Sequence, residues 1–332
     1  MRFPNMCRTL ALLAALAGTA AASIAQGPQA GAWPAGPVTV VVPFPAGGSV
    51  DAAARIVLQR LAERLGQPVV VDNVPGAAGT IGTQRVVRAK PDGQTLLFAV
   101  ASPVTVAPLV SPQTVKYDAL KDLAPVSGVA VAPFVLVGQP ALAPRTTAEL
   151  VALARRRPGT LNYGTDGVGT SMHVVAELIK QQAGLDLVHV PYKLGPQVLT
   201  ELAGNQIELA VLPVTLAQPF IKEGRVRAYG VSSRQRWPSL PDVPALAETA
   251  ELRQVDVESW YGLLAPAQVD RAIVERLAGQ VAAVLAEPDI QRKLDDAGLK
   301  PLPMPPAQFA AYLARERQAL GAVVAAAGIR VP

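Results

Sequence analysis

The sequence predicts an α/β fold with a parallel sheet, and three observations support this. Four valines lie within residues 38–42, a β-branched run typical of a strand that is buried on both faces. A glycine-rich turn follows, and after it the amphipathic segment 52–65 predicts a helix. The same order recurs, with further strands predicted over 68–72 and 94–100. Strands that alternate with helices in this way form parallel sheets with right-handed crossovers.

The turn after the first strand is a candidate anion-binding site. Gly47 and Gly48 allow the backbone to turn tightly and to approach a ligand closely. Ser49 and Asp51 suit the cap and first turn of the following helix. This order directs free N–H groups and the positive end of a helix at one spot, which favours a carboxylate or phosphate. The alternative is a turn that only connects a strand to a helix.

The second half of the chain repeats this pattern. A polar connector is predicted over 101–124, and two apolar runs follow at 125–131 and 134–137. Thr146 and Glu149 form a capping box before a helix that ends near 157. Strands are then expected over 161–163, 186–190, 207–212 and 226–231, and helices over 172–183, 196–203 and 217–222. Beyond Ser232 the pattern predicts helices only, over 271–285, 288–297 and 306–326.

Residues 1–25 have the features of a cleavable export signal. Arg2 and Arg8 precede an apolar stretch over 10–22, and residues 23–25 fit a small-x-small cleavage site. The alternative is an N-terminal membrane anchor, but the apolar stretch is short for a span. We therefore expect a protein exported to the periplasm.

Composition excludes several classes of function. The net charge is +5, but the basic residues are scattered and form no stripe with interleaved aromatic residues, so nucleic acid is not an expected partner. The only cysteine lies inside the expected export signal, which leaves no disulfide or thiol chemistry. With two histidines in the whole chain, neither a transition-metal site nor a cofactor is expected.

Nine short strings, taken together, resemble a known family. They are residues 42–51, 73–82, 91–93, 117–118, 161–163, 169–173, 189–193, 241–244 and 259–262. In order and spacing they resemble the Bug (TctC-type) extracytoplasmic solute receptors of the tripartite tricarboxylate transporters. The resemblance extends over roughly residues 34 to 330.

The resemblance implies a type II periplasmic-binding-protein fold, in which two α/β domains are joined by two crossover strands and a ligand binds in the cleft between them. We expect domain 1 over 34–123 and 232–332 and domain 2 over 124–231, with the hinge near 131–137 and 229–233. The implied function is that of a monomeric periplasmic receptor that passes a small carboxylate to the permease subunits of a tripartite transporter. An alternative is a sensor subunit that presents the carboxylate to a two-component kinase.

The resemblance also implies where the ligand binds, chiefly through backbone amides of two turns. The candidate ligand-binding residues are Phe44, Ala46, Gly47, Gly48, Ser49, Asp51, Ser102, Gly169, Thr170, Ser171, His173, Tyr192, Lys193 and Leu212. Leu194, Pro196, Leu212 and Pro213 stand where family members are more polar or open. These four residues lead us to expect a monocarboxylate with an apolar or aromatic body.

A Ser/His hydrolase is the remaining alternative. It would use Ser171 with His173 or His189, and Asp166 to orient the base. However, Ser171 and His173 are two positions apart at the start of a helix and would not face each other. A receptor is therefore favoured over an enzyme.

Overall fold

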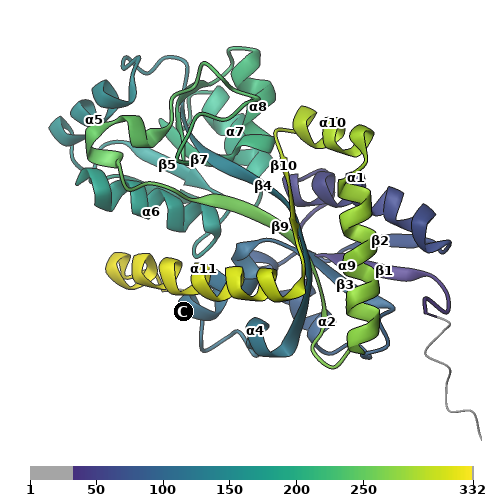
Figure 1. Ribbon diagram of the computed structural model, residues 1–332. Coiled ribbons are helices and arrows are strands. Elements are labelled where there is room, and N and C mark those ends of the chain that lie inside the picture. The colour runs from purple at the N-terminus through teal and green to yellow at the C-terminus, as the bar shows by residue number, and fades with distance from the viewer. Residues whose placement is uncertain (1–32, 331–332) are drawn as a thin grey trace, which may run out of the picture. The chain divides into compact units, whose positions relative to one another are not determined.

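The computed structural model describes residues 33–330 (Figure 1). It begins with the predicted alternation of strands and helices: β1 (Val38–Val42), α1 (Ser49–Leu65), β2 (Val69–Asn73), α2 (Thr80–Val87) and β3 (Thr95–Ala99). A short 3-10 helix, η1 (Ala77–Gly79), precedes α2. β1 pairs in parallel with both β2 and β3, so that Val40 faces Val71 on one side and Leu96 on the other. The predicted parallel unit is confirmed. The expected export signal over 1–25 lies outside the described residues.

Helix α1 begins three residues earlier than the sequence pattern predicts. Its N-cap is Gly48, in an extended conformation with φ −78° and ψ 171°, and no side chain caps the helix. Asp51, in the first turn, accepts hydrogen bonds from the Gly47 amide and from Arg55, both at 2.9 Å. The helix stops at Gly66, whose left-handed φ of 66° suits a glycine C-cap. The carboxylate of Asp51 therefore stabilises the turn before α1 through its hydrogen bond from the Gly47 amide.

The second half contains α5 (Thr147–Arg156), β5 (Asn162–Thr165), α6 (Ser171–Ala183), β6 (Val188–Pro191), α7 (Gly195–Ala203), β7 (Leu209–Pro213), α8 (Val214–Lys222) and β8 (Arg227–Val231). Half of the predicted capping box is present, because the Thr146 hydroxyl accepts a hydrogen bond from the Glu149 amide at 3.2 Å. The Glu149 carboxylate accepts from the Arg145 amide at 2.7 Å, one residue before the amide that the box would use. β5 pairs in parallel with β6 and with β7. The repeat of strand, turn and helix is confirmed here as well.

One long strand joins the two halves. β4 (Leu123–Gly138) is 16 residues long and contains both of the predicted apolar runs. Its first part pairs antiparallel with β9 (Glu258–Pro266), and its second part pairs antiparallel with β7 and β8. The resulting sheet has the order β2-β1-β3-β9-β4-β7-β5-β6.

Two strands contradict the expectation of helices only beyond Ser232. β9 is almost wholly buried between β3 and β4 and shows no polar alternation, so periodicity could not reveal it. β10 (Lys300–Met304) pairs antiparallel with β4 and contains Pro301 and Pro303, which argue against a strand. Two 3-10 helices, η3 (Leu246–Glu248) and η4 (Ala250–Leu252), precede β9.

The prediction of a polar connector over 101–124 is also wrong. It folds into a π-helix, η2 (Ser102–Val106), and two short helices, α3 (Ala107–Val110) and α4 (Ala119–Asp122). Val104 and Val106 are fully buried. The three prolines of the segment suggested a loop, but the apolar residues between them pack into the core.

The C-terminal helices return to the first half of the chain. α9 (Arg271–Leu285) lies beside α1, and α10 (Pro288–Asp296) also contacts α1 (Figure 1). Glu287, between them, accepts from Arg60 and Arg64 of α1. α11 (Pro306–Ala327) packs on η2 and α6. α9 and α10 thus contact the first half of the chain, and α11 contacts both halves. The discontinuous first domain and its boundaries stay a prediction. No helix within residues 33–330 is both long and apolar enough to cross a membrane.

The side chain of Glu316, on α11, directs its carboxyl group into the core. Glu316 accepts hydrogen bonds from the Trp260 indole at 2.6 Å and from the Thr105 hydroxyl at 2.8 Å. Burial raises the pKa of Glu316 to about 7. The folded state therefore binds this proton more tightly than the unfolded chain does. The contribution of this group to stability is complete below the unfolded pKa, near 4.5, and is lost as pH rises through 7.

Glu316→Gln is expected to remove this pH dependence, because the amide oxygen still accepts both hydrogen bonds and carries no charge. Relative to wild type, the free energy of unfolding should be unchanged near pH 4.5 and higher by about 2–3 kcal/mol at pH 8. Urea unfolding at the two pH values measures this. Glu275→Gln, at an exposed position on α9, is the control. An equal effect of Glu316→Gln at both pH values would contradict the prediction.

Candidate functional site

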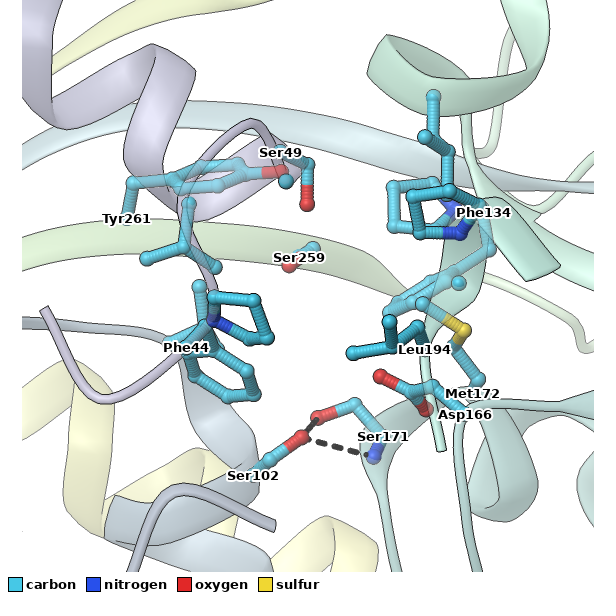
Figure 2. A pocket seen from close by; sticks show the side chains of 18 of the residues that line it. Phe44, Ser49, Ser102, Phe134, Asp166, Ser171, Met172, Leu194, Ser259 and Tyr261 are labelled. Atoms are coloured by element: carbon cyan, nitrogen blue, oxygen red, sulfur yellow. Dashed lines mark hydrogen bonds between the residues drawn. The ribbon is translucent and has the colours of Figure 1, made fainter. Parts of the chain in front are cut away.

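A cavity of about 120 Å³ lies where the first turn of the chain meets the start of α6 (Figure 2). Phe44, Gly48 and Ser49 line it from the first half, and Ser171 and Lys193 from the second. Phe134 of β4 and Tyr261 of β9 complete its wall. A neighbouring cavity of about 420 Å³ shares part of this wall. The shared residues are Phe44, Pro45, Asp166, Lys193 and Leu194.

The start of α1 offers hydrogen-bond donors to the cavity. Ser49 and Val50 line it, and within residues 33–330 neither of their amides has a hydrogen-bond partner. The Tyr261 hydroxyl is buried and has no partner among the same residues. In Figure 2 this hydroxyl lies next to Ser49. These groups, with the positive end of the helix, suit an anion.

The start of α6 approaches the same cavity and is tied to the first half of the chain. Thr170 caps the helix by accepting from the His173 amide at 3.4 Å. The Ser171 amide donates to the Ser102 hydroxyl at 3.0 Å, and the two serine hydroxyls lie 2.9 Å apart (Figure 2). Ser102 thus joins the end of β3 to the first turn of α6.

The candidate ligand-binding residues fall into two groups. Those that line the first cavity are Phe44, Ala46, Gly48, Ser49, Ser102, Ser171 and Lys193. The others, Gly47, Asp51, Gly169, Thr170, His173, Tyr192 and Leu212, are not part of that wall. Thr170 lines the second cavity, and Leu212 is fully buried in the core of β7. The Asp51 carboxylate is engaged by Gly47 and Arg55. Gly169 donates to His173 Nδ1 at 3.1 Å.

Sequence reasoning did not place several wall residues at the site. They are Phe134, Asp166, Met172, Leu216, Ser259 and Tyr261. Phe134 and Tyr261 lie on β4 and β9, which pair in the sheet although the two residues are more than a hundred positions apart in the sequence. No local sequence pattern indicates that these strands pair. Asp166 carried a signal, since it is an acidic residue in a glycine-rich turn between a strand and a helix.

Asp166 is an electrostatic exception within this wall. Its Oδ1 atom is buried and has no hydrogen-bond partner among the described residues. Burial raises the pKa of Asp166 to about 6. The Thr170 hydroxyl and the Asp166 amide oppose this rise in pKa without reversing it.

The arrangement does not assemble a hydrolase triad. His189 Nε2 lies 2.6 Å from the Thr165 hydroxyl, and its ring stacks on that of His173 at 4.0 Å. Burial lowers the pKa of both imidazoles. Within residues 33–330, the Ser171 hydroxyl bonds to Ser102 and to neither histidine. The same residues contain no group of three or more His, Cys, Asp or Glu side chains that could hold a metal ion.

Comparison with known proteins decides the family. Residues 53–329 match the family described as "Tripartite tricarboxylate transporter family receptor". The chain belongs to this family. The resemblance to Bug and TctC-type receptors drawn from the nine strings is therefore confirmed, and with it the receptor class of function.

Individual members of this receptor family agree in sequence and fold. The chain is 32% identical to protein BugT of Bordetella pertussis over 327 residues, which cover 98% of this chain and 99% of BugT. A solved structure of R. palustris Rpa4515 with adipate superposes with a TM-score of 0.85 at 32% identity, covering 90% of this chain and 99% of that one. The structure of MatC from Rhodopseudomonas palustris with bound malate superposes with a TM-score of 0.81 at 30% identity. The match covers 88% of this chain and 100% of MatC. The predicted two-domain binding-protein fold is confirmed.

Proposed function

We propose that this receptor works in the periplasm, binds a small carboxylate in the cavity between α1 and α6, and delivers it to the membrane subunits of a tripartite transporter. The observation that carries the proposal is that Ser49 and Val50 line the cavity while their amides have no partner within residues 33–330. Amides at a helix N-terminus bind a carboxylate without needing a cationic side chain. The carboxylates bound by the two R. palustris receptors, adipate and malate, support the same ligand class.

The remaining wall suits an apolar ligand body. Phe134, Leu194, Pro196, Pro213 and Leu216 line the cavity. An apolar group placed against them gains about 25 cal/mol for each Å² removed from water. A second carboxylate placed against these apolar side chains would lose its hydration, and the only cation in this wall within residues 33–330, Lys193, is exposed to solvent. We therefore keep a monocarboxylate with an apolar or aromatic body as the proposed ligand, although Leu212 does not contribute as the sequence suggested.

Receptor and enzyme are distinguished by what the site does to its ligand. Ser171 is engaged by Ser102, and no base contacts it among the described residues, so we propose that the ligand leaves unchanged. Delivery to a sensor kinase in place of permease subunits would use the same cavity. Measuring carboxylate uptake in cells that lack the permease subunits of a tripartite transporter separates these two partners.

Mass spectrometry of the ligand that co-purifies with the receptor, followed by a thermal-shift screen, tests the proposal. We expect a carboxylate that stabilises the protein by about 2.7 kcal/mol at 100 times its dissociation constant. The screen compares aromatic and branched monocarboxylates with citrate, succinate, aspartate and glutamate. A largest shift from a di- or tricarboxylate would contradict the apolar ligand body. Absence of any bound carboxylate in both measurements would contradict the proposed function.

A further inference from the structure

Asp166 has an acceptor atom that residues 33–330 leave unsatisfied, and it lines both cavities. The residue follows β5. Its Oδ1 atom is buried and has no hydrogen-bond partner within residues 33–330. Leaving a buried acceptor unpaired costs about 1–3 kcal/mol, and more when it is charged. Buried polar atoms in folded proteins nearly always have partners, so a donor from outside the chain is expected here.

The Thr170 hydroxyl and the Asp166 amide act on this carboxyl group and partly offset the effect of burial on its pKa, but neither bonds to Oδ1. The Thr170 hydroxyl donates to the Gly167 carbonyl oxygen at 3.0 Å. Among the described residues that line the two cavities, Lys193 is the only cation, and it forms no ion pair within 4.0 Å with Asp166. Lys193 is itself exposed to solvent. In Figure 2 the neighbours of the Asp166 carboxylate include Leu194 and Met172, which are apolar. Burial raises the pKa of Asp166 to about 6, so the carboxyl group is still mainly ionised at neutral pH and can accept.

The site therefore has two ends of opposite character. Ser49 and the Tyr261 hydroxyl lie in the upper part of the view in Figure 2, and Asp166 lies at the lower right, next to Leu194. The first side presents donors and suits the ligand carboxylate. The second side presents an acceptor and suits a donor. A ligand that spans the cavity meets both.

We propose that Asp166 determines ligand specificity by accepting a hydrogen bond from a hydroxyl or ammonium group of the bound carboxylate. This inference rests on the proposed function and narrows its ligand class to hydroxy acids and amino acids. An unsubstituted acid of the same skeleton would leave Asp166 buried and unpaired. A hydrogen bond to a charged group contributes about 1.5–3 kcal/mol, which corresponds to a preference of tenfold or more.

Two matched ligand series test the inference by calorimetry on the purified receptor. One is 3-phenylpropionate, phenyllactate and phenylalanine, and the other is succinate, malate and aspartate. Within each series the second carbon carries hydrogen, a hydroxyl or an ammonium group. In the series that binds, we expect a donor-bearing member to bind at least tenfold more tightly than the unsubstituted acid. The ranking of the hydroxyl against the ammonium member identifies the donor.

Three variants complete the design. Asp166→Leu removes the acceptor, so the ratio of affinities between the donor-bearing and the unsubstituted ligand should fall to about one. Asp242→Leu, at an exposed position away from both cavities, should leave it unchanged. Asp166→Asn keeps the size but not the charge, and should lower the preference for the ammonium member even if the leucine variant fails to fold.

An unsubstituted acid that binds as tightly as its donor-bearing partners would overturn the role of Asp166 and leave the proposed function intact. The role of Asp166 would also be overturned if Asp166→Asn and Asp166→Leu both kept the wild-type preference for the donor-bearing ligand. Binding by no member of either series also overturns the inference. The mass-spectrometric result above then decides separately whether the receptor binds carboxylates.

Discussion

Replacing Gly48 with valine is expected to weaken carboxylate binding at least a hundredfold while the fold survives. Gly48 lines the cavity, and its φ of −78° and ψ of 171° are open to any residue. A Cβ atom there would approach only the Pro45 carbonyl oxygen, at 3.4 Å. The added isopropyl group would enter the cavity of about 120 Å³ and cover the amide of Ser49. We expect a change of less than about 1 kcal/mol in the free energy of unfolding.

Calorimetry with the carboxylate identified by mass spectrometry measures this effect. Gly279→Val is the matched control, because a Cβ at that position on α9 meets no atom within 4 Å. Unchanged affinity in Gly48→Val would contradict the role of the first turn. The sequence suggested that the conformational freedom of both glycines serves the tight turn, and for Gly48 this is wrong. Gly47, with φ of 79°, is the glycine of this turn that needs the left-handed region.

Replacing Trp260 with alanine is expected to have the largest effect on stability. The side chain is fully buried, and its ring packs edge-on against Phe309 with 5.3 Å between centroids. Truncation of a buried tryptophan costs about 3–5 kcal/mol through lost contacts and the cavity left behind. The indole also donates to Glu316 at 2.6 Å, and losing that donor adds about 1–3 kcal/mol at a pH where Glu316 is ionised.

Urea unfolding at pH 8 measures the total loss of stability in Trp260→Ala. The variant Trp260→Phe separates the packing contribution from that of the hydrogen bond to Glu316. The phenylalanine variant keeps much of the packing but cannot donate to Glu316, so its loss of stability should be smaller and should shrink at pH 4.5. A loss below about 2 kcal/mol in Trp260→Ala would contradict the packing argument. Equal losses in both variants would show that the hydrogen bond, and not the ring, carries the effect.

Local chemistry explains which parts of the fold could be predicted. The valines of β1 and the glycines after it determine strand and turn within a few residues, because β-branched side chains and positive φ values act locally. The N-cap at Thr146 and the amphipathic pattern of α9 are equally local. β9 and β10 could not be predicted, because their structure depends on residues far away in the sequence. One is buried on both faces and the other contains two prolines, so only pairing with β4 makes them strands.

The same distinction applies to the candidate site. The donor side, from Gly48 to Ser49, follows from an unbroken stretch of sequence that ends in a helix N-terminus. The sequence strings were also sufficient to identify the family. The acceptor side required the folded chain, because whether Asp166 is hydrated, paired or left without a partner depends on which distant residues surround it. Phe134, Asp166 and Tyr261 come from three separate strands or turns, and the sheet alone brings them to one cavity.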